Sequence, residues 1–240
     1  MPQGRLFLIP VPLKKIEGPV DVAAVLPAAV CAQAKRLTHF VAENAKSARA
    51  FLKALPSDTP LQQIEIAELN EHTQAASIDG LLAPLRAGFD VGLVSEAGCP
   101  AVADPGAELV ARAHAEGILV LPMIGPSSIL LALMGSGLSG QNFAFHGYLP
   151  SKEELRQKRI RELEKDSRLE KRTQIFIETP YRNRQMLQTL VSACAASTRI
   201  CVATDLSLAS ESIQTGRPAE WRRRGWPDID RRPSVFLLQA

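Results

Sequence analysis

Apolar and polar residues alternate along the first half of the chain in a pattern that predicts strands and helices in turn. Apolar, β-rich stretches are followed by segments whose apolar positions recur at helical spacing. The expected strands lie at residues 5–11, 38–41, 63–69, 90–95 and 118–121, and the expected helices at 21–36, 44–55, 78–87 and 105–116. Strands that are joined by helices through short connections favour right-handed crossovers and a mostly parallel sheet.

Several polar residues and one proline mark where these helices begin. Asp21 and Asn44 stand at N-cap positions, where a side-chain oxygen accepts hydrogen bonds from the first free N–H groups of a helix. Asp104, directly before Pro105, has the sequence of an N-cap for the helix at 105–116. Pro27 lacks an N–H group, so we expect it to kink or delay the first helix.

The second half of the chain has a different order of elements. Helices are expected at 126–134, 151–172 and 181–196, and strands at 143–147, 173–178, 199–204, 211–215 and 234–239. Adjacent late strands with a long return connection indicate a mixed sheet. We place the domain boundary near residues 122–126, which gives an N-terminal α/β domain at 1–122 and a C-terminal α/β domain at 123–240.

The most informative stretch is residues 93–106, Leu-Val-Ser-Glu-Ala-Gly-Cys-Pro-Ala-Val-Ala-Asp-Pro-Gly. It follows a strand of the expected parallel sheet, and ligands of α/β proteins usually bind at the carboxyl ends of such strands. Gly98 allows the backbone to approach a ligand closely. Residues 121–128, Leu-Pro-Met-Ile-Gly-Pro-Ser-Ser, repeat the arrangement. The two loops predict one ligand that is held largely by backbone groups, and ordinary strand-to-helix connections are the alternative.

Composition narrows the class of protein. Of the 240 residues, 46% are hydrophobic and 22% are charged, which is typical of a globular chain and not of a disordered one. No apolar stretch reaches the ~20 residues of a membrane span, and the N-terminus lacks a basic leader and a cleavage site. The cysteines show neither a zinc spacing nor a C-x-x-C pair, and the histidines are scattered. We therefore expect a cytoplasmic protein with free thiols, no membrane segment and no metal.

Four motifs resemble those of a known methyltransferase family, in the same order. Residues 95–106 are similar to Ser-Asp-Ala-Gly-Thr-Pro-x-x-x-Asp-Pro-Gly, and residues 125–138 to Gly-Pro-Ser-Ala followed by Leu-Ser-Ala-Ser-Gly-Leu. Residues 145–152 are similar to Gly-Phe-Leu-Pro-x-Lys, and residues 177–182 to Tyr-Glu-Ser-Pro-His-Arg. Together these motifs resemble small-subunit ribosomal RNA methyltransferase I, a family of cytidine 2′-O-ribose methyltransferases within the tetrapyrrole methylase superfamily.

Three other segments depart from the family pattern. Residues 11–15, Val-Pro-Leu-Lys-Lys, lack the Gly-Asn of the family's Thr-Pro-Ile-Gly-Asn-Leu. Residues 43–46, Glu-Asn-Ala-Lys, replace Glu-Asp-Thr-Arg, and residues 204–208, Thr-Asp-Leu-Ser-Leu, replace Arg-Glu-Leu-Thr-Lys. The chain therefore resembles a divergent paralogue, and ribosomal RNA does not follow as its substrate from the motifs.

The resemblance implies a two-domain tetrapyrrole-methylase-like fold, with a mostly parallel N-terminal sheet, a mixed C-terminal sheet and the cofactor cleft between them. It also implies a homodimer and S-adenosylmethionine as the cofactor. The carboxylate of that cofactor fits the N–H groups that begin the helix after Pro126, and its adenine fits the backbone near residues 203–206. The positions that match family cofactor contacts are Pro12, Ala97, Gly98, Cys99, Val102, Ser127, Ser128 and Glu178, to which the adenine slot adds Leu206.

Methyl transfer to a ribose hydroxyl benefits from a nearby base, because the hydroxyl is a poor nucleophile at neutral pH. We favour Glu96 as this catalytic residue, and Glu43, Asp104 and His146 are the alternatives. Helix capping and pairing with an arginine are the competing roles for these carboxylates. Cys99 has no recognisable partner for nucleophilic catalysis.

The function stays open among three alternatives, of which the first two differ in the methyl acceptor. The net charge of +3 is mild, but residues 221–226, Trp-Arg-Arg-Arg-Gly-Trp, offer arginines for phosphates and tryptophans for base stacking. A surface with the tryptophans packed inward is the competing interpretation. The first alternative is 2′-O-methylation of RNA, as in ribosomal RNA processing. The second is methylation of a tetrapyrrole or another small molecule, and the third is a cofactor-binding protein without catalysis.

Overall fold

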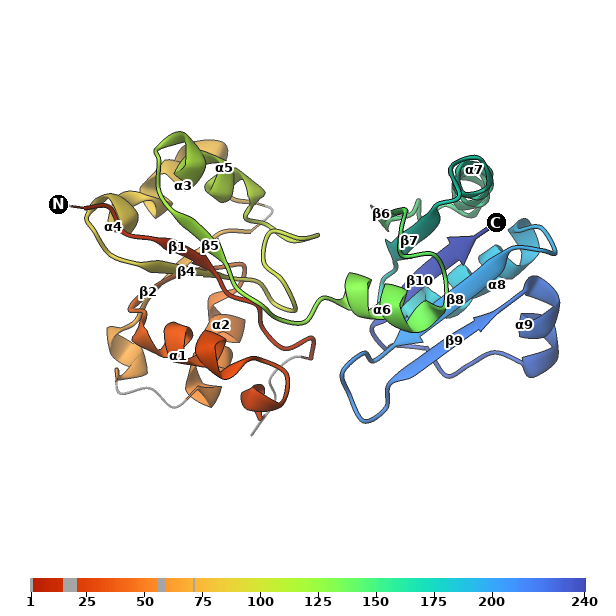
Figure 1. The fold of residues 1–240 in the computed structure, drawn as a ribbon, viewed down its shortest axis with the longest axis horizontal. Helices are drawn as coiled ribbons and strands as arrows, with labels where there is room; N and C mark the ends of the chain where they lie inside the picture. Colours follow the sequence, from red (N-terminus) through yellow and green to blue (C-terminus); the bar gives the residue numbers. More distant parts are fainter. Residues whose placement is uncertain (1, 15–20, 56–58, 71) are drawn as a thin grey trace. The chain divides into compact units, whose positions relative to one another are not determined.

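The computed structural model describes residues 2–14, 21–55, 59–70 and 72–240 (Figure 1). Lys15, the last residue of the divergent segment 11–15, lies outside the described residues. The chain divides into two compact units, Met1–Ser127 and Ser128–Ala240. The first unit includes the segment that follows its last strand, so the division falls a few residues after the expected boundary at 122/123.

The first unit is built on a parallel sheet of five strands in the order β3-β2-β4-β1-β5. The strands are β1 (Leu6–Leu8), β2 (His39–Ala42), β3 (Glu65–Glu68), β4 (Val91–Val94) and β5 (Val120–Pro122). The α-helices are α1 (Ala28–Arg36), α2 (Ala45–Ala54), α3 (Ala75–Leu81), α4 (Ala83–Arg86) and α5 (Ala107–Ala115), with short 3-10 helices at Val22–Ala24 and Leu61–Gln63. The expected parallel sheet is confirmed.

Alternation along the strands gives this sheet an apolar layer on each face. Phe7 and Phe40 belong to the core that includes residues of α1 and α2. Their neighbours Leu6 and Val41 belong to a second core with residues of α3, α4 and α5. Figure 1 shows the two groups of helices on opposite faces of the sheet. Successive side chains point to opposite faces of a strand, so both faces must be covered, as parallel sheets require.

The second unit contains a mixed sheet in the order β6-β7-β10-β8-β9. Its strands are β6 (Phe143–Tyr148), β7 (Thr173–Ile177), β8 (Arg199–Thr204), β9 (Ser212–Gly216) and β10 (Ser234–Gln239). Its helices are α6 (Ser128–Ser136), α7 (Glu153–Glu170), α8 (Asn183–Ala193) and α9 (Pro218–Arg224), with a 3-10 helix at Pro180–Arg182. The β6–β7 pair is parallel, and the β7–β10, β10–β8 and β8–β9 pairs are antiparallel, which confirms the expected mixed sheet.

Two of the predicted caps are confirmed and one is wrong. Asn44 Oδ1 accepts hydrogen bonds from the backbone N–H groups of Lys46 and Ser47 at 2.9 and 3.1 Å. Asp21 caps the 3-10 helix, and α1 begins only after Pro27, as the missing N–H of proline predicts. Asp104 does not cap α5, because the chain turns through Pro105 and the N-cap is Gly106.

Helix α9 was not expected from the sequence. Pro218 occupies its first turn, and the side chain of Glu220 accepts a hydrogen bond from the N–H of Arg217 at 2.9 Å. The helix is short and carries three consecutive arginines, so its local pattern suggests a charged loop. Trp221 anchors it, because the indole is fully buried and its N–H donates to the carbonyl of Ile200 at 3.1 Å.

Candidate functional site

Three loops of the first unit meet at the carboxyl ends of the neighbouring strands β4, β1 and β5, of which β5 is the edge strand of the sheet. The segment after β1 forms an isolated antiparallel bridge with the loop after β4, in which Val11 and Gly98 exchange backbone hydrogen bonds of 2.9 and 3.1 Å. Cys99 Sγ lies 3.4 Å from the carbonyl oxygen of Pro126, in the segment after β5. The structure thus brings together the segments that carry Pro12, Gly98, Cys99 and Ser127.

Gly98 holds a backbone conformation that other residues rarely adopt. Its φ is +74°, in the left-handed region. A Cβ atom at this position would lie 3.1 Å from Leu13 Cδ2 and 3.3 Å from Pro126 O. Leu13 and the backbone at Pro126 are therefore closely packed around this residue. The predicted approach of this backbone to a ligand stays a prediction.

Parts of the rest of this loop are exposed, and its backbone is strained. Ala97 is exposed, and the Val102 side chain is 48% exposed. Ala101 and Ala103 both have φ of 63°, a conformation that persists in non-glycine residues only where the surroundings enforce it. Burial raises the pKa of the Cys99 thiol, which disfavours the thiolate and therefore a nucleophilic role.

Three carboxylates gather beside the same loop. The N–H of Glu96 donates to Glu43 Oε2 at 3.2 Å, and the Ser47 hydroxyl donates to Glu96 Oε1 at 2.9 Å. Burial, followed by the negative charge of Glu43, raises the pKa of Asp104 to about 6. The structure therefore joins Glu96 with both alternative carboxylates, and Asp104 titrates near neutral pH.

The remaining predicted residues belong to the second unit. Ser128 is the first residue of α6. Glu178 follows β7 and is buried, and its Oε1 accepts hydrogen bonds from Arg182 Nη2 and Nε at 2.6 and 3.0 Å and from the N–H of Thr179 at 2.7 Å. Its second oxygen, Oε2, is buried without a partner among the described residues. Buried acceptors are nearly always hydrogen-bonded, so this oxygen is a candidate to accept a hydrogen bond from a ligand.

Leu206 and His146 lie in different parts of the second unit. Leu206 is buried directly after β8, between Asp205 and Ser207, which have φ of 51° and 68°. His146 lies on β6 and its Nε2 is 2.6 Å from Gln174 Oε1.

Two of the three arginines at 222–224 donate hydrogen bonds to backbone carbonyls of this chain. Arg222 donates to the carbonyl of Val191 at 2.8 Å, and Arg224 donates to the carbonyl of Thr215 at 3.0 Å. The interpretation of an inward-packed tryptophan is confirmed for Trp221, whereas Trp226 is partly exposed. Arg223 lies between the two anchored arginines and is exposed.

Neither a membrane span nor a metal cluster is found in the part of the chain that the structure describes. No helix there has the length and apolar character to cross a bilayer. No group of three or more His, Cys, Asp or Glu side chains there could hold a metal ion.

Solved structures of other proteins share the whole fold of this chain. The methyltransferase CobJ superposes with a TM-score of 0.62 at 17% identity, over 98% of this chain and 93% of that protein. A uroporphyrin-III C-methyltransferase from Thermus thermophilus, solved with S-adenosylhomocysteine, superposes with a TM-score of 0.58 at 16% identity, over 98% and 97% of the two chains. These likenesses confirm the two-domain tetrapyrrole-methylase fold.

Sequence relatives are more specific, although no family model matches the chain. The ribosomal RNA small subunit methyltransferase I of Vibrio cholerae is 34% identical over 146 residues, which are 61% of this chain and 49% of that protein. The protein of the same name from Pseudomonas aeruginosa is 30% identical over 215 residues, 90% of this chain and 71% of that protein. The relatives confirm the expectation of a methyltransferase. With this identity over most of its length, the chain belongs to the family of ribosomal RNA small subunit methyltransferase I.

Proposed function

We propose that this chain transfers the methyl group of S-adenosylmethionine to a ribose 2′-hydroxyl of RNA. The observation that carries the proposal is the joining of the loops after β1, β4 and β5 through the Val11–Gly98 bridge and the Cys99–Pro126 contact. This site lies where α/β proteins bind ligands, and it carries the motifs at 95–106 and 125–138 through which the sequence resembles the family.

The residues present fit the cofactor. The Val11–Gly98 bridge holds the 97–102 loop beside Pro12, and main-chain groups of this loop other than the paired N–H and C=O of Gly98 are those that we assign to the cofactor. Ser127 and Ser128 stand at the start of α6, and the N-terminal end of a helix favours a carboxylate. Glu178 Oε2 is an unsatisfied acceptor that suits an amino or hydroxyl group, and the backbone at Leu206 suits adenine. When bound, the cofactor supplies a methyl group on a positively charged sulfur.

The carboxylate cluster supplies the base in this proposal. A general base works best when its pKa lies near the working pH. Asp104, with a pKa of about 6, meets this condition, and Glu96 is the carboxylate whose position the Ser47 hydroxyl fixes. One of the two takes the proton of the ribose hydroxyl, and Glu96 stays our first candidate. Glu96→Gln and Asp104→Asn, compared for turnover at saturating cofactor, identify which one acts.

A second candidate is a cofactor-binding protein without catalysis. The divergent segments favour it, because Leu208 stands where the family pattern has lysine and residues 43–46 lack the aspartate, threonine and arginine of the family. This candidate keeps the cofactor site and loses the acceptor site.

Transfer of a labelled methyl group tests the alternatives directly. The protein is incubated with labelled S-adenosylmethionine and either total RNA or a small-molecule extract. Label in RNA at a ribose position supports the proposal, and label in the extract alone favours a tetrapyrrole or similar acceptor. Calorimetric binding of S-adenosylhomocysteine without any transfer favours the second candidate.

We further propose that the chain forms a homodimer. Helix α6 is almost entirely apolar, yet its Leu130 and Met134 side chains are 49% and 78% exposed, one turn apart. Large exposed apolar residues at neighbouring positions are typical of an interface, and closed isologous pairs are the commonest oligomers. Light scattering at micromolar concentration should give the mass of a dimer. Met134→Glu should shift that mass toward the monomer, and a monomeric wild type would contradict the proposal.

A further inference from the structure

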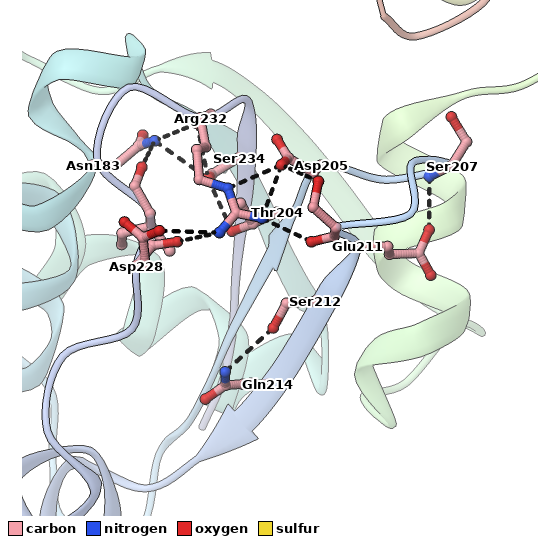
Figure 2. A network of polar contacts seen from close by, with 12 residues as sticks. Asn183, Thr204, Asp205, Ser207, Glu211, Ser212, Gln214, Asp228, Arg232 and Ser234 are labelled. Atoms are coloured by element: carbon pink, nitrogen blue, oxygen red, sulfur yellow. Dashed lines mark hydrogen bonds and ion pairs between the residues drawn. The ribbon is translucent and has the colours of Figure 1, made fainter.

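A single arginine side chain links three segments of the second unit (Figure 2). Arg232 lies just before β10. Its Nε and Nη2 donate to Asp205 Oδ2 at 2.9 and 2.8 Å, directly after β8. Nη2 also donates to the carbonyl of Ser210 at 2.7 Å, and Nη1 donates to the carbonyl of Asp228 at 2.6 Å. The guanidinium thus ties both ends of the β8–β9 loop to the chain that precedes β10.

The loop that Arg232 holds has an unusual backbone. Asp205 and Ser207, on either side of Leu206, have φ of 51° and 68°. Two left-handed residues so close together need support from their surroundings. That support comes from Asp205, which accepts a hydrogen bond from the Ser210 hydroxyl at 2.7 Å, and from Glu211, whose Oε2 accepts from the Ser207 N–H at 2.6 Å (Figure 2).

The backbone of Arg232 is fixed by a hydrogen bond from Asn183. Asn183 is fully buried, and its Nδ2 donates to the carbonyl of Arg232 at 2.7 Å and to the carbonyl of Ile229 at 2.9 Å. Ser234, two residues after Arg232, forms a hydrogen bond of 3.0 Å between its hydroxyl and that of Thr204, the last residue of β8. The position of the guanidinium is therefore fixed by the sheet and by the start of α8, and not by the loop alone.

The ion pair between Arg232 and Asp205 is largely shielded from solvent. The side chains of Arg232 and Asp205 are 23% and 10% exposed. Charge-assisted hydrogen bonds in such surroundings are stronger than those on an open surface. The planar guanidinium also reaches several acceptors at fixed angles, which a lysine ammonium cannot do.

We infer that Arg232 is a positioning residue, which clamps the backbone around Leu206 in the shape that receives the adenine of the cofactor. The inference rests on the proposed function, because the proposed function assigns the adenine to the loop around Leu206. Arg232 does not touch the reacting atoms. Its loss should weaken cofactor affinity and raise the KM for S-adenosylmethionine, while kcat at saturating cofactor stays unchanged.

The test compares Arg232→Gln and Arg232→Lys with Arg184→Gln. Arg184 is a matched control, because it forms an ion pair of 2.8 Å with Asp230 in the same unit. Hydrogen exchange of the free protein reports the order of residues 205–211, and calorimetry with S-adenosylhomocysteine reports affinity. A thermal shift assay verifies that each variant is folded.

Arg232→Gln should raise the exchange rate across 205–211 and weaken S-adenosylhomocysteine binding, each about tenfold. Arg232→Lys should show the same losses despite its charge, and Arg184→Gln should match the wild type in both measurements. Unchanged exchange in Arg232→Gln, or full recovery by lysine, would overturn the clamp. Faster exchange with unchanged affinity would overturn its role toward the cofactor. A wild type that binds no S-adenosylhomocysteine would instead refute the proposed function, and the exchange data would still decide whether the clamp exists.

Discussion

Gly98→Val should abolish cofactor binding at a moderate cost to the stability of the fold. Gly98 has φ of +74°, and a branched residue in the left-handed region loses about 1–3 kcal/mol. The new Cβ would meet Leu13 Cδ2 at 3.1 Å and Pro126 O at 3.3 Å, so the side chain and the backbone must shift by a few tenths of an ångström. For a chain of this size, each kcal/mol lowers the melting temperature by about 2–4 °C. The protein should therefore stay folded at 25 °C.

Gly117→Val separates the loss of binding from the loss of stability. Gly117 has φ of +70°, and apart from its two chain neighbours no described residue has an atom within 4 Å of an added Cβ. It follows Glu116, the C-cap of α5, and so lies at the opposite end of that helix from the 97–102 loop. Both variants should lose similar stability from the backbone conformation, as measured by urea unfolding. Calorimetry with S-adenosylhomocysteine should show wild-type affinity for Gly117→Val and no binding for Gly98→Val. Equal affinities in the two variants would refute the placement of the cofactor at the 97–102 loop.

Three further predictions follow from particular side chains. Asp104 has a folded-state pKa of about 6, which burial raises from 3.8, so its contribution to the free energy of unfolding is lost as the pH rises from 3.8 to about 6. The urea midpoint of the wild type should fall over this pH range relative to that of Asp104→Asn. Parallel pH profiles of the two proteins would contradict the prediction. If RNA is the acceptor, Arg223→Ala should reduce the salt dependence of RNA binding by about 0.7 log units, with cofactor affinity unchanged, and an unaltered slope would remove Arg223 from the RNA contact. Trp221→Phe loses the hydrogen bond to Ile200 O and part of a fully buried side chain. It should therefore lower the free energy of unfolding by about 1–3 kcal/mol. A smaller change would contradict the anchoring of α9 by the indole.

Local sequence determined most of the elements and the class of the fold. The caps at Asp21 and Asn44 and the delay at Pro27 depend on groups within a few residues of one another, and all three match the structure. The strand–helix alternation of the first half and the late strands of the second half predicted a parallel and a mixed sheet, because side-chain periodicity and connection length constrain strand direction. The motifs at 95–106 and 177–182 led to the correct family.

The tertiary structure decided which side chains meet. Glu43 and Glu96 are 53 positions apart, and they come together because β2 and β4 are neighbours in the sheet, an order that no local pattern contains. Arg232 and Asp205, 27 positions apart, pair for a similar reason, since β10 lies beside β8. The helix at 218–224 also depended on tertiary packing, because Trp221 is buried in the core. Short-range propensities fix an element's type, but the free energy that selects its ends and its polar contacts comes from burial against residues far away in the sequence.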